Sequence, residues 1–299
     1  MGYLFLGISL IAGVVKGYCS KKMGNSTNKI TDAILINLLR MIICIFIGFA
    51  MVSVQSVSAL KVNFKELGIM FVSGIMTSLF VVFWLIAIRN GTYMLLNVFL
   101  MVGVFVTLVC SYFMLGEKIE INHWVGLVIL FVSVLIMCSY DRSQRSAMSM
   151  KSLMLLIAVA VTNGLTDFSQ KFYVNRAAET NISVFNFYTY VFSAAVLTLA
   201  YFIFNNCHKY KAEQSAVGVT IRKFGVCIVI MSICLFLNSF FKTKAAIYLP
   251  ATQIYPAYQG GGLILSTAMA AVCFGEKVTL RCVIGLCMAF ASLLVINMM

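Results

Sequence analysis

The sequence predicts an all-α membrane protein with ten transmembrane helices in a 5+5 inverted repeat. Its composition, the spacing of its apolar stretches and an internal repeat predict this fold. Hydrophobic residues make up 62% of the 299 residues and charged residues only 10%. Soluble domains average about 45–50% apolar residues. The composition therefore excludes a soluble globular protein, a disordered chain and a collagen-like one.

The chain is basic, with 22 Lys and Arg against nine Asp and Glu and a net charge of +13. These basic residues lie singly between apolar runs and form no stripe that follows a phosphate backbone. Scattered basic loops are instead the usual topology signal of a membrane protein. We therefore expect the lipid bilayer, and no nucleic acid, as a partner.

Apolar stretches recur along the whole chain, and a spanning helix needs about 20 mostly apolar residues. The stretches lie at residues 3–20, 33–54, 67–88, 92–115, 120–140, 151–172, 182–205, 221–245, 250–274 and 280–298. They predict ten transmembrane helices with no separate soluble domain.

An internal repeat relates the two parts of the chain. A shift of 159 residues places 87–136 on 246–295, and it matches Gly116-Glu117-Lys118 with Gly275-Glu276-Lys277, Gly126 with Gly285, and Ser133 with Ser292. Each half of the chain then holds five spans, and an odd number of spans turns the second half upside down in the membrane. We therefore predict two five-helix halves, residues 1–145 and 146–299.

Several motifs of the second half resemble the drug/metabolite transporter superfamily, in proteins with two EamA-type halves. They are Ala245–Ala251, Tyr255-Pro256, Gly260–Gly262 and Phe274–Lys277. The resemblance implies ten helices, a 5+5 inverted arrangement and transport of a small metabolite by alternating access, without fixing the substrate. The first half departs from the pattern, because Gly91 and Asn97 stand where the second half has Pro250 and Pro256.

Two opposite charges occupy equivalent positions of the repeat. Matching Gly13 with Gly164 places Lys16 on Asp167, and a charge inside a span needs a partner or a watery cavity. These two residues are predicted to meet near the centre of the cavity as a pair for substrate binding or proton coupling. Two alternatives stay open: Asp167 pairs with Lys171 one helical turn away, or Lys16 extends to the lipid headgroups.

Other basic residues also lie in or near apolar runs. Arg40 is a candidate for holding a carboxylate or phosphate bidentately, with reach to the membrane interface as the alternative. Lys242 and Lys244 follow Asn238 and lie close to the turn before Pro250. By position both are candidates for the lining of a cavity that attracts anions, but we expect at least one of the two lysines to extend to the headgroups.

The ninth span carries the richest polar face and is predicted to form a ligand wall through Thr252, Tyr255 and Gln259. An interfacial aromatic belt is the alternative. In the fourth span, Tyr93 and Asn97 lie one turn apart, and Trp84 in the third span is a candidate ring wall or a lipid-facing residue. The candidate substrate-binding residues are thus Lys16, Arg40, Trp84, Tyr93, Asn97, Asp167, Thr252, Tyr255 and Gln259.

The chain offers little for catalysis. His123 and His208 lie at span edges without a metal-binding or nucleophile motif. Glu117 and Glu276 lie at corners between spans, where a structural role is expected. We therefore predict no enzyme activity, no catalytic residue, no metal and no cofactor.

The sequence thus predicts a secondary transporter of a small polar metabolite, such as an amino acid or amine, in a plasma membrane of the bacterial inner-membrane type. A flippase for a lipid-linked metabolite and a non-transporting membrane subunit are the alternatives. The expected partner is a small-molecule substrate; a coupling proton or ion and a homodimer stay open. The basic loops place the termini outside, whereas the resemblance implies termini in the cytoplasm.

Overall fold

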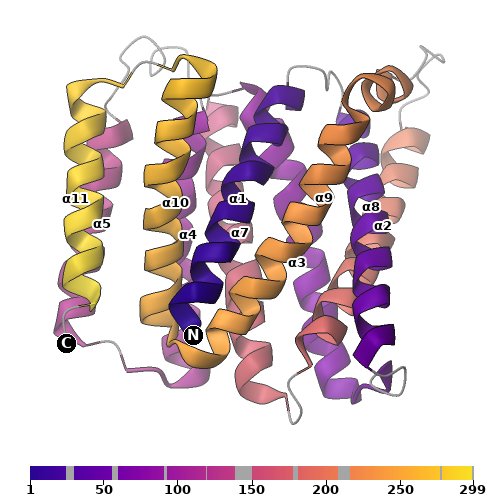
Figure 1. Ribbon diagram of the computed structural model, residues 1–299, viewed down its shortest axis with the longest axis horizontal. Helices are drawn as coiled ribbons and strands as arrows, with labels where there is room; N and C mark the ends of the chain where they lie inside the picture. The colour runs from indigo at the N-terminus through magenta and orange to yellow at the C-terminus, as the bar shows by residue number, and fades with distance from the viewer. Residues whose placement is uncertain are drawn as a thin grey trace.

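The ten apolar stretches form ten helices in the computed structural model (Figure 1). The structure describes residues 1–24, 30–55, 60–90, 93–118, 120–138, 150–177, 181–207, 216–276 and 278–297. Their helices are α1 (Gly2–Gly24), α2 (Ile30–Gln55), α3 (Phe64–Asn90), α4 (Tyr93–Leu115), α5 (Ile121–Cys138), α7 (Met150–Arg176), α8 (Ile182–Cys207), α9 (Ala216–Tyr248), α10 (Ala251–Phe274) and α11 (Leu280–Asn297). The predicted all-α class with ten helices is confirmed for these residues.

The polarity of the bundle is reversed relative to a soluble protein. Large apolar side chains such as Phe46, Phe113 and Val272 point outward, at 71%, 78% and 84% exposure, while Arg40 and Asp167 are buried. Within the described residues, eight helices are long and apolar enough to cross a membrane, and the apolar parts of α5 and α11 are shorter. This distribution is typical of a multi-pass membrane protein, in which lipid covers the outer surface.

The two Gly-Glu-Lys corners are equivalent helix ends. Gly116 after α4 and Gly275 after α10 have φ angles of 68° and 63°, in the left-handed region that favours glycine. After α10, the Glu276 N–H donates to the Ala270 carbonyl at 3.1 Å and closes the last turn. Glycine is therefore required at both corners by backbone geometry.

Helices α5 and α11 exchange the same hydrogen bond in both directions. Ser133 Oγ donates to the Gly285 carbonyl at 2.6 Å, and Ser292 Oγ donates to the Gly126 carbonyl at 2.6 Å. These are the residues that the 159-residue shift matches with one another. Such reciprocity is what a two-fold axis between α5 and α11 produces.

The other helix contacts are also related by the internal repeat. Helix α1 packs on α9 and α3 on α7, while α2 packs on α8 and α4 on α10. Close approach of α4 and α7 depends on Gly103 and Gly164, because a methyl group on Gly103 would collide with the Ala160 carbonyl oxygen. The predicted boundary between residues 145 and 146 lies outside the described residues and stays a prediction.

Candidate functional site

A cavity of about 70 Å³ lies inside the bundle, between helices α1, α3, α4, α7, α8, α9 and α10. Its walls combine apolar side chains with an unusual number of polar ones for the interior of a membrane protein. The polar and charged lining residues are Lys16, Thr77, Asn97, Asn163, Thr166, Asp167, Gln170, Asn238, Ser239, Lys242, Gln259 and Ser266. This cavity is the candidate substrate site.

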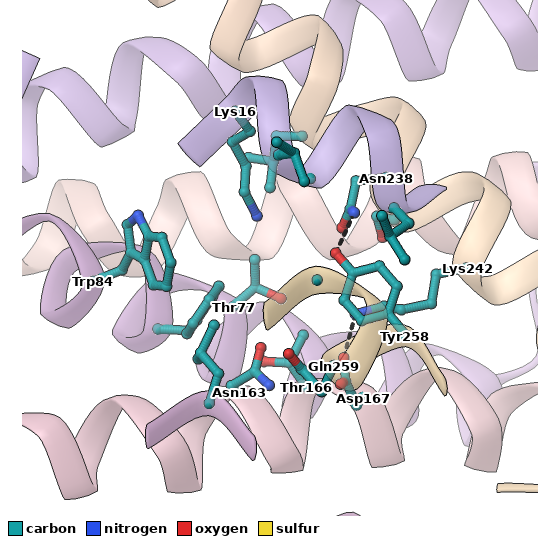
Figure 2. Close-up of a pocket in the computed structure, with 18 of the residues that line it drawn as sticks. Lys16, Thr77, Trp84, Asn163, Thr166, Asp167, Asn238, Lys242, Tyr258 and Gln259 are labelled. Atoms are coloured by element: carbon teal, nitrogen blue, oxygen red, sulfur yellow. Dashed lines mark hydrogen bonds and ion pairs between the residues drawn. The ribbon is translucent and has the colours of Figure 1, made fainter. Parts of the chain in front are cut away.

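An ion pair crosses the cavity wall from α7 to α9. The Lys242 ammonium binds the Asp167 carboxylate (Figure 2), and the two residues are only 5% and 1% exposed. The Tyr255 hydroxyl donates to the backbone carbonyl of Asp167 at 2.6 Å. Asp167 is therefore held by α9 through its carboxylate and by α10 through its backbone.

This pairing corrects two of the predictions for Asp167. Its salt-bridge partner is Lys242, and neither Lys16 nor Lys171 lies within salt-bridge distance among the described contacts. Lys171 instead donates to the Ala246 and Leu249 carbonyls at 2.9 and 2.8 Å. Lys16 and Asp167 line the same cavity without forming a direct ion pair.

Tyr258 and Asn238 continue the wall beside this ion pair. Lys242 Nζ lies 4.8 Å from the centre of the Tyr258 ring, and the Asn238 amide donates to the Tyr258 hydroxyl. The Asn238 side-chain amide also donates to the Ser9 backbone carbonyl at 2.7 Å, and Ser9 Oγ donates to the Asn238 backbone carbonyl at 2.8 Å. The network therefore joins α1, α9 and α10 on one side of the cavity.

Lys16 also enters the cavity from α1 (Figure 2). Its ammonium lies 5.8 Å from the Phe80 ring centre and 5.9 Å from that of Trp84. No carboxylate of the described residues lies within 4.0 Å of it. The ring faces stabilise the cation only in part, so Lys16 has no counterion in the described part of the cavity.

Residues 1–139 match the EamA-like transporter family. The match confirms the predicted resemblance to the drug/metabolite transporter superfamily and, with the apolar helices, shows a multi-pass membrane protein. A search of curated proteins gave no match.

A solved structure shares the fold of this chain over nearly its whole length. It is described only as the crystal structure of a protein, and it aligns with a TM-score of 0.67 at 13% identity. The alignment covers 97% of this chain and 96% of the other. At this identity the likeness concerns the fold alone.

The cavity contains five of the nine predicted substrate-binding residues. These are Lys16, Trp84, Asn97, Asp167 and Gln259. They come from α1, α3, α4, α7 and α10, and their role in substrate binding stays a prediction.

Three other predicted residues are buried outside the cavity lining. Arg40 is 2% exposed and donates to Asn37 Oδ1 at 2.6 Å within α2. Thr252 and Tyr255 lie behind the wall, with Tyr255 bound to α7. The alternative that Arg40 reaches the interface is wrong, because its side chain packs inside the bundle. The side chain of Tyr93 lies outside the described part of the structure.

The list of predicted substrate-binding residues lacks three residues that line the cavity, namely Lys242, Asn163 and Tyr258. Lys242 follows Asn238 by one turn, and Asn163 precedes Asp167 by one turn, so each pair shares a helix face. Residues 163, 166, 167 and 170 all line the cavity. Polar residues at this helical spacing are the sequence feature that could have identified these lining residues.

The acids of the two Gly-Glu-Lys corners lie away from the cavity and hold helix ends. Glu117 Oε2 accepts from the Ala251 N–H at 2.9 Å, at the start of α10, and Oε1 lies 3.5 Å from Lys171 Nζ. Glu276, just after α10, lies 3.7 Å from Lys21 Nζ. Each glutamate thus meets a lysine from the first helix of the other half.

Proposed function

We propose that the protein is a secondary transporter that carries a small polar metabolite across the membrane by alternating access. The observation that carries this proposal is the buried polar cavity, whose walls come from both sides of the internal repeat. Transporters with inverted repeats place their substrate site at this interface, near the bilayer midplane. The family match of residues 1–139 supports the same function class.

The buried charges support a transport site over a purely structural core. An uncompensated charge inside a membrane is costly, and charged residues there usually mark substrate or ion pathways. Lys16, Asp167 and Lys242 all line one cavity. A bundle that only had to pack would be as stable with apolar residues at these positions.

The two corner contacts support a rocking movement of the halves. Glu117 binds the first residue of α10, and Glu276 follows the last turn of that helix, so the contacts lie at opposite ends of α10. Breaking one contact while keeping the other would open the cavity toward one side. Alternating access in the proposed mechanism therefore exchanges the Glu117–Lys171 contact for the Glu276–Lys21 contact.

The proposal places the transporter in a plasma membrane of the bacterial inner-membrane type. Its expected partners are the substrate and the bilayer, with a proton or ion as the coupling partner to be tested. Fractionation of cells that express the tagged chain tests the location. A chain found mainly in another membrane would contradict it.

The deciding experiment measures ligand binding and transport with the full chain. The purified protein is heated with amino acids, amines, organic acids, nucleotide sugars and lipid headgroups, because a ligand of the folded state raises the unfolding midpoint. Hits are then tested by counterflow in proteoliposomes. We expect one chemical class both to stabilise the protein and to be transported.

Variants of lining residues test whether transport depends on the cavity. The double variant Asp167→Asn/Lys242→Met removes both charges of the pair and is expected to lose transport. Lys244→Gln is the matched control, because Lys244 lies on the same helix outside the cavity lining. Binding of headgroups alone would favour a flippase, and a stable protein without any ligand or transport would overturn the proposal.

A further inference from the structure

The charges around the cavity do not balance. Among the described residues of the lining, Asp167 is the only acidic one, and Lys242 already neutralises it. Lys16 remains as a second cation of the lining. The cavity therefore keeps an excess of positive charge that favours an anionic ligand.

An unpaired hydrogen-bond donor faces the same space. The side-chain amide of Asn163 on α7 lines the cavity and is 6% exposed, yet its Nδ2 has no hydrogen-bond partner within the described part of the chain. A buried donor without a partner costs about 1–3 kcal/mol. Asn163 thus offers hydrogen atoms to a ligand from the wall opposite α1.

Lys16 and Asn163 approach one space from different helices. Figure 2 shows Lys16 pointing into the cavity from α1, with Asn163 on α7 beyond Thr77. The Trp84 and Phe80 rings form the adjoining wall, close to the Lys16 ammonium. The site therefore combines a cation, a neutral donor and an apolar surface.

We infer that the cavity binds a small organic carboxylate, with the carboxylate between Lys16 and Asn163 and the apolar body against Phe80 and Trp84. The inference rests on the proposed function and names its substrate class. An amine is disfavoured, because the acidic side chain of the described lining is already occupied by Lys242. A single unpaired lysine with an amide suits a monoanion, and a cavity of about 70 Å³ selects a small one.

The test compares ligands that differ only in their charged group. Butyrate, butyramide and butylamine form one set, and benzoate, benzamide and benzylamine form a second set with a larger body. The unfolding midpoint of the purified full chain is measured against the concentration of each probe. In at least one set, we expect the carboxylate to stabilise the wild-type protein and the amide and amine to have no comparable effect.

Variants of both walls locate the binding site. Lys16→Gln should weaken carboxylate binding by about tenfold or more, because the ligand charge loses its partner. Lys16→Arg should restore much of it, and Asn163→Leu should weaken it from the opposite wall. Lys244→Gln is the control and should bind the carboxylate like wild type. If Lys16→Gln does not fold, Lys16→Arg and Asn163→Leu decide the question.

The outcomes separate this inference from the proposed function. Stronger stabilisation by amides or amines, or unchanged carboxylate binding in Lys16→Gln or Asn163→Leu, would overturn the carboxylate site. If proteoliposomes then transport another chemical class, the transporter proposal survives alone. If no compound of any class binds or is transported, the proposed function itself fails.

Discussion

Lys242 of α9 and Asp167 of α7 form an ion pair in the cavity wall, and the Tyr255 hydroxyl fixes the Asp167 backbone from α10. Three helices of the second half therefore meet at one acidic residue. The pair neutralises the carboxylate, which leaves Lys16 as the cation that faces the described cavity without a counterion. The electrostatic character of the site follows from which lysine reaches Asp167.

Removal of one member of this pair should destabilise the protein more than removal of both. Asp167→Asn leaves Lys242 buried without a counterion, and Lys242→Met leaves the carboxylate alone; each single change should cost about 3–5 kcal/mol. The double variant removes both charges and should lie closer to wild type. Unfolding midpoints of the purified proteins, with Lys244→Gln as control, measure the three effects. Additive losses in the double variant would contradict a direct pair.

The fold was predictable because its signals are local or repeated. Each span shows its own apolar stretch, and the register of the repeat pairs Ser133 with Ser292 and Gly126 with Gly285 on residue identity alone. The hydrogen bonds between these residues connect each serine with the glycine of the other helix. The apolar stretches thus predict the number of helices, and the internal repeat predicts which residues of α5 and α11 are equivalent.

The partner of Asp167 was not predictable in the same way. Lys171, Lys16 and Lys242 are all available in the sequence, and the choice depends on how α9 is rotated about its axis. That rotation points Lys242 inward, although its proximity to Pro250 favoured the headgroups. Lys171 does not pair with Asp167, because its ammonium donates to the Ala246 and Leu249 carbonyls at the end of α9. Tertiary packing therefore decides the pairing.

Close packing of α4 on α7 should depend on Gly103. A methyl group there would collide with the Ala160 backbone carbonyl, which belongs to another helix and cannot rotate away. Gly103→Ala should therefore lower the unfolding free energy by about 1–3 kcal/mol, as overpacking does. Gly7→Ala is the control, because nothing lies within 4 Å of its added methyl. Equal midpoints for the two variants would show that α4 and α7 separate without penalty.

Glu117 should stabilise the start of α10. Its carboxylate accepts from the Ala251 N–H at 2.9 Å, and Pro250 before it provides no side-chain cap. Glu117→Ala should reduce stability by about 0.5–2 kcal/mol, as loss of a helix cap does. Glu120→Ala changes an exposed glutamate of the same connection and serves as the control. Similar midpoints for these two variants would remove the capping role.

The reciprocal serine bonds should contribute equally and independently to the α5–α11 contact. Ser133→Ala and Ser292→Ala each remove one buried hydrogen bond of 2.6 Å to a glycine carbonyl. Each should therefore cost about 0.5–1.5 kcal/mol. The bonds join different residues and share no atom, so the double variant should lose the sum of the two effects. Ser53→Ala is the control, because that serine is exposed and bonds within its own helix. The unfolding midpoints of the four variants measure this symmetry, and a large effect of one serine with none of the other would contradict the two-fold relation between α5 and α11.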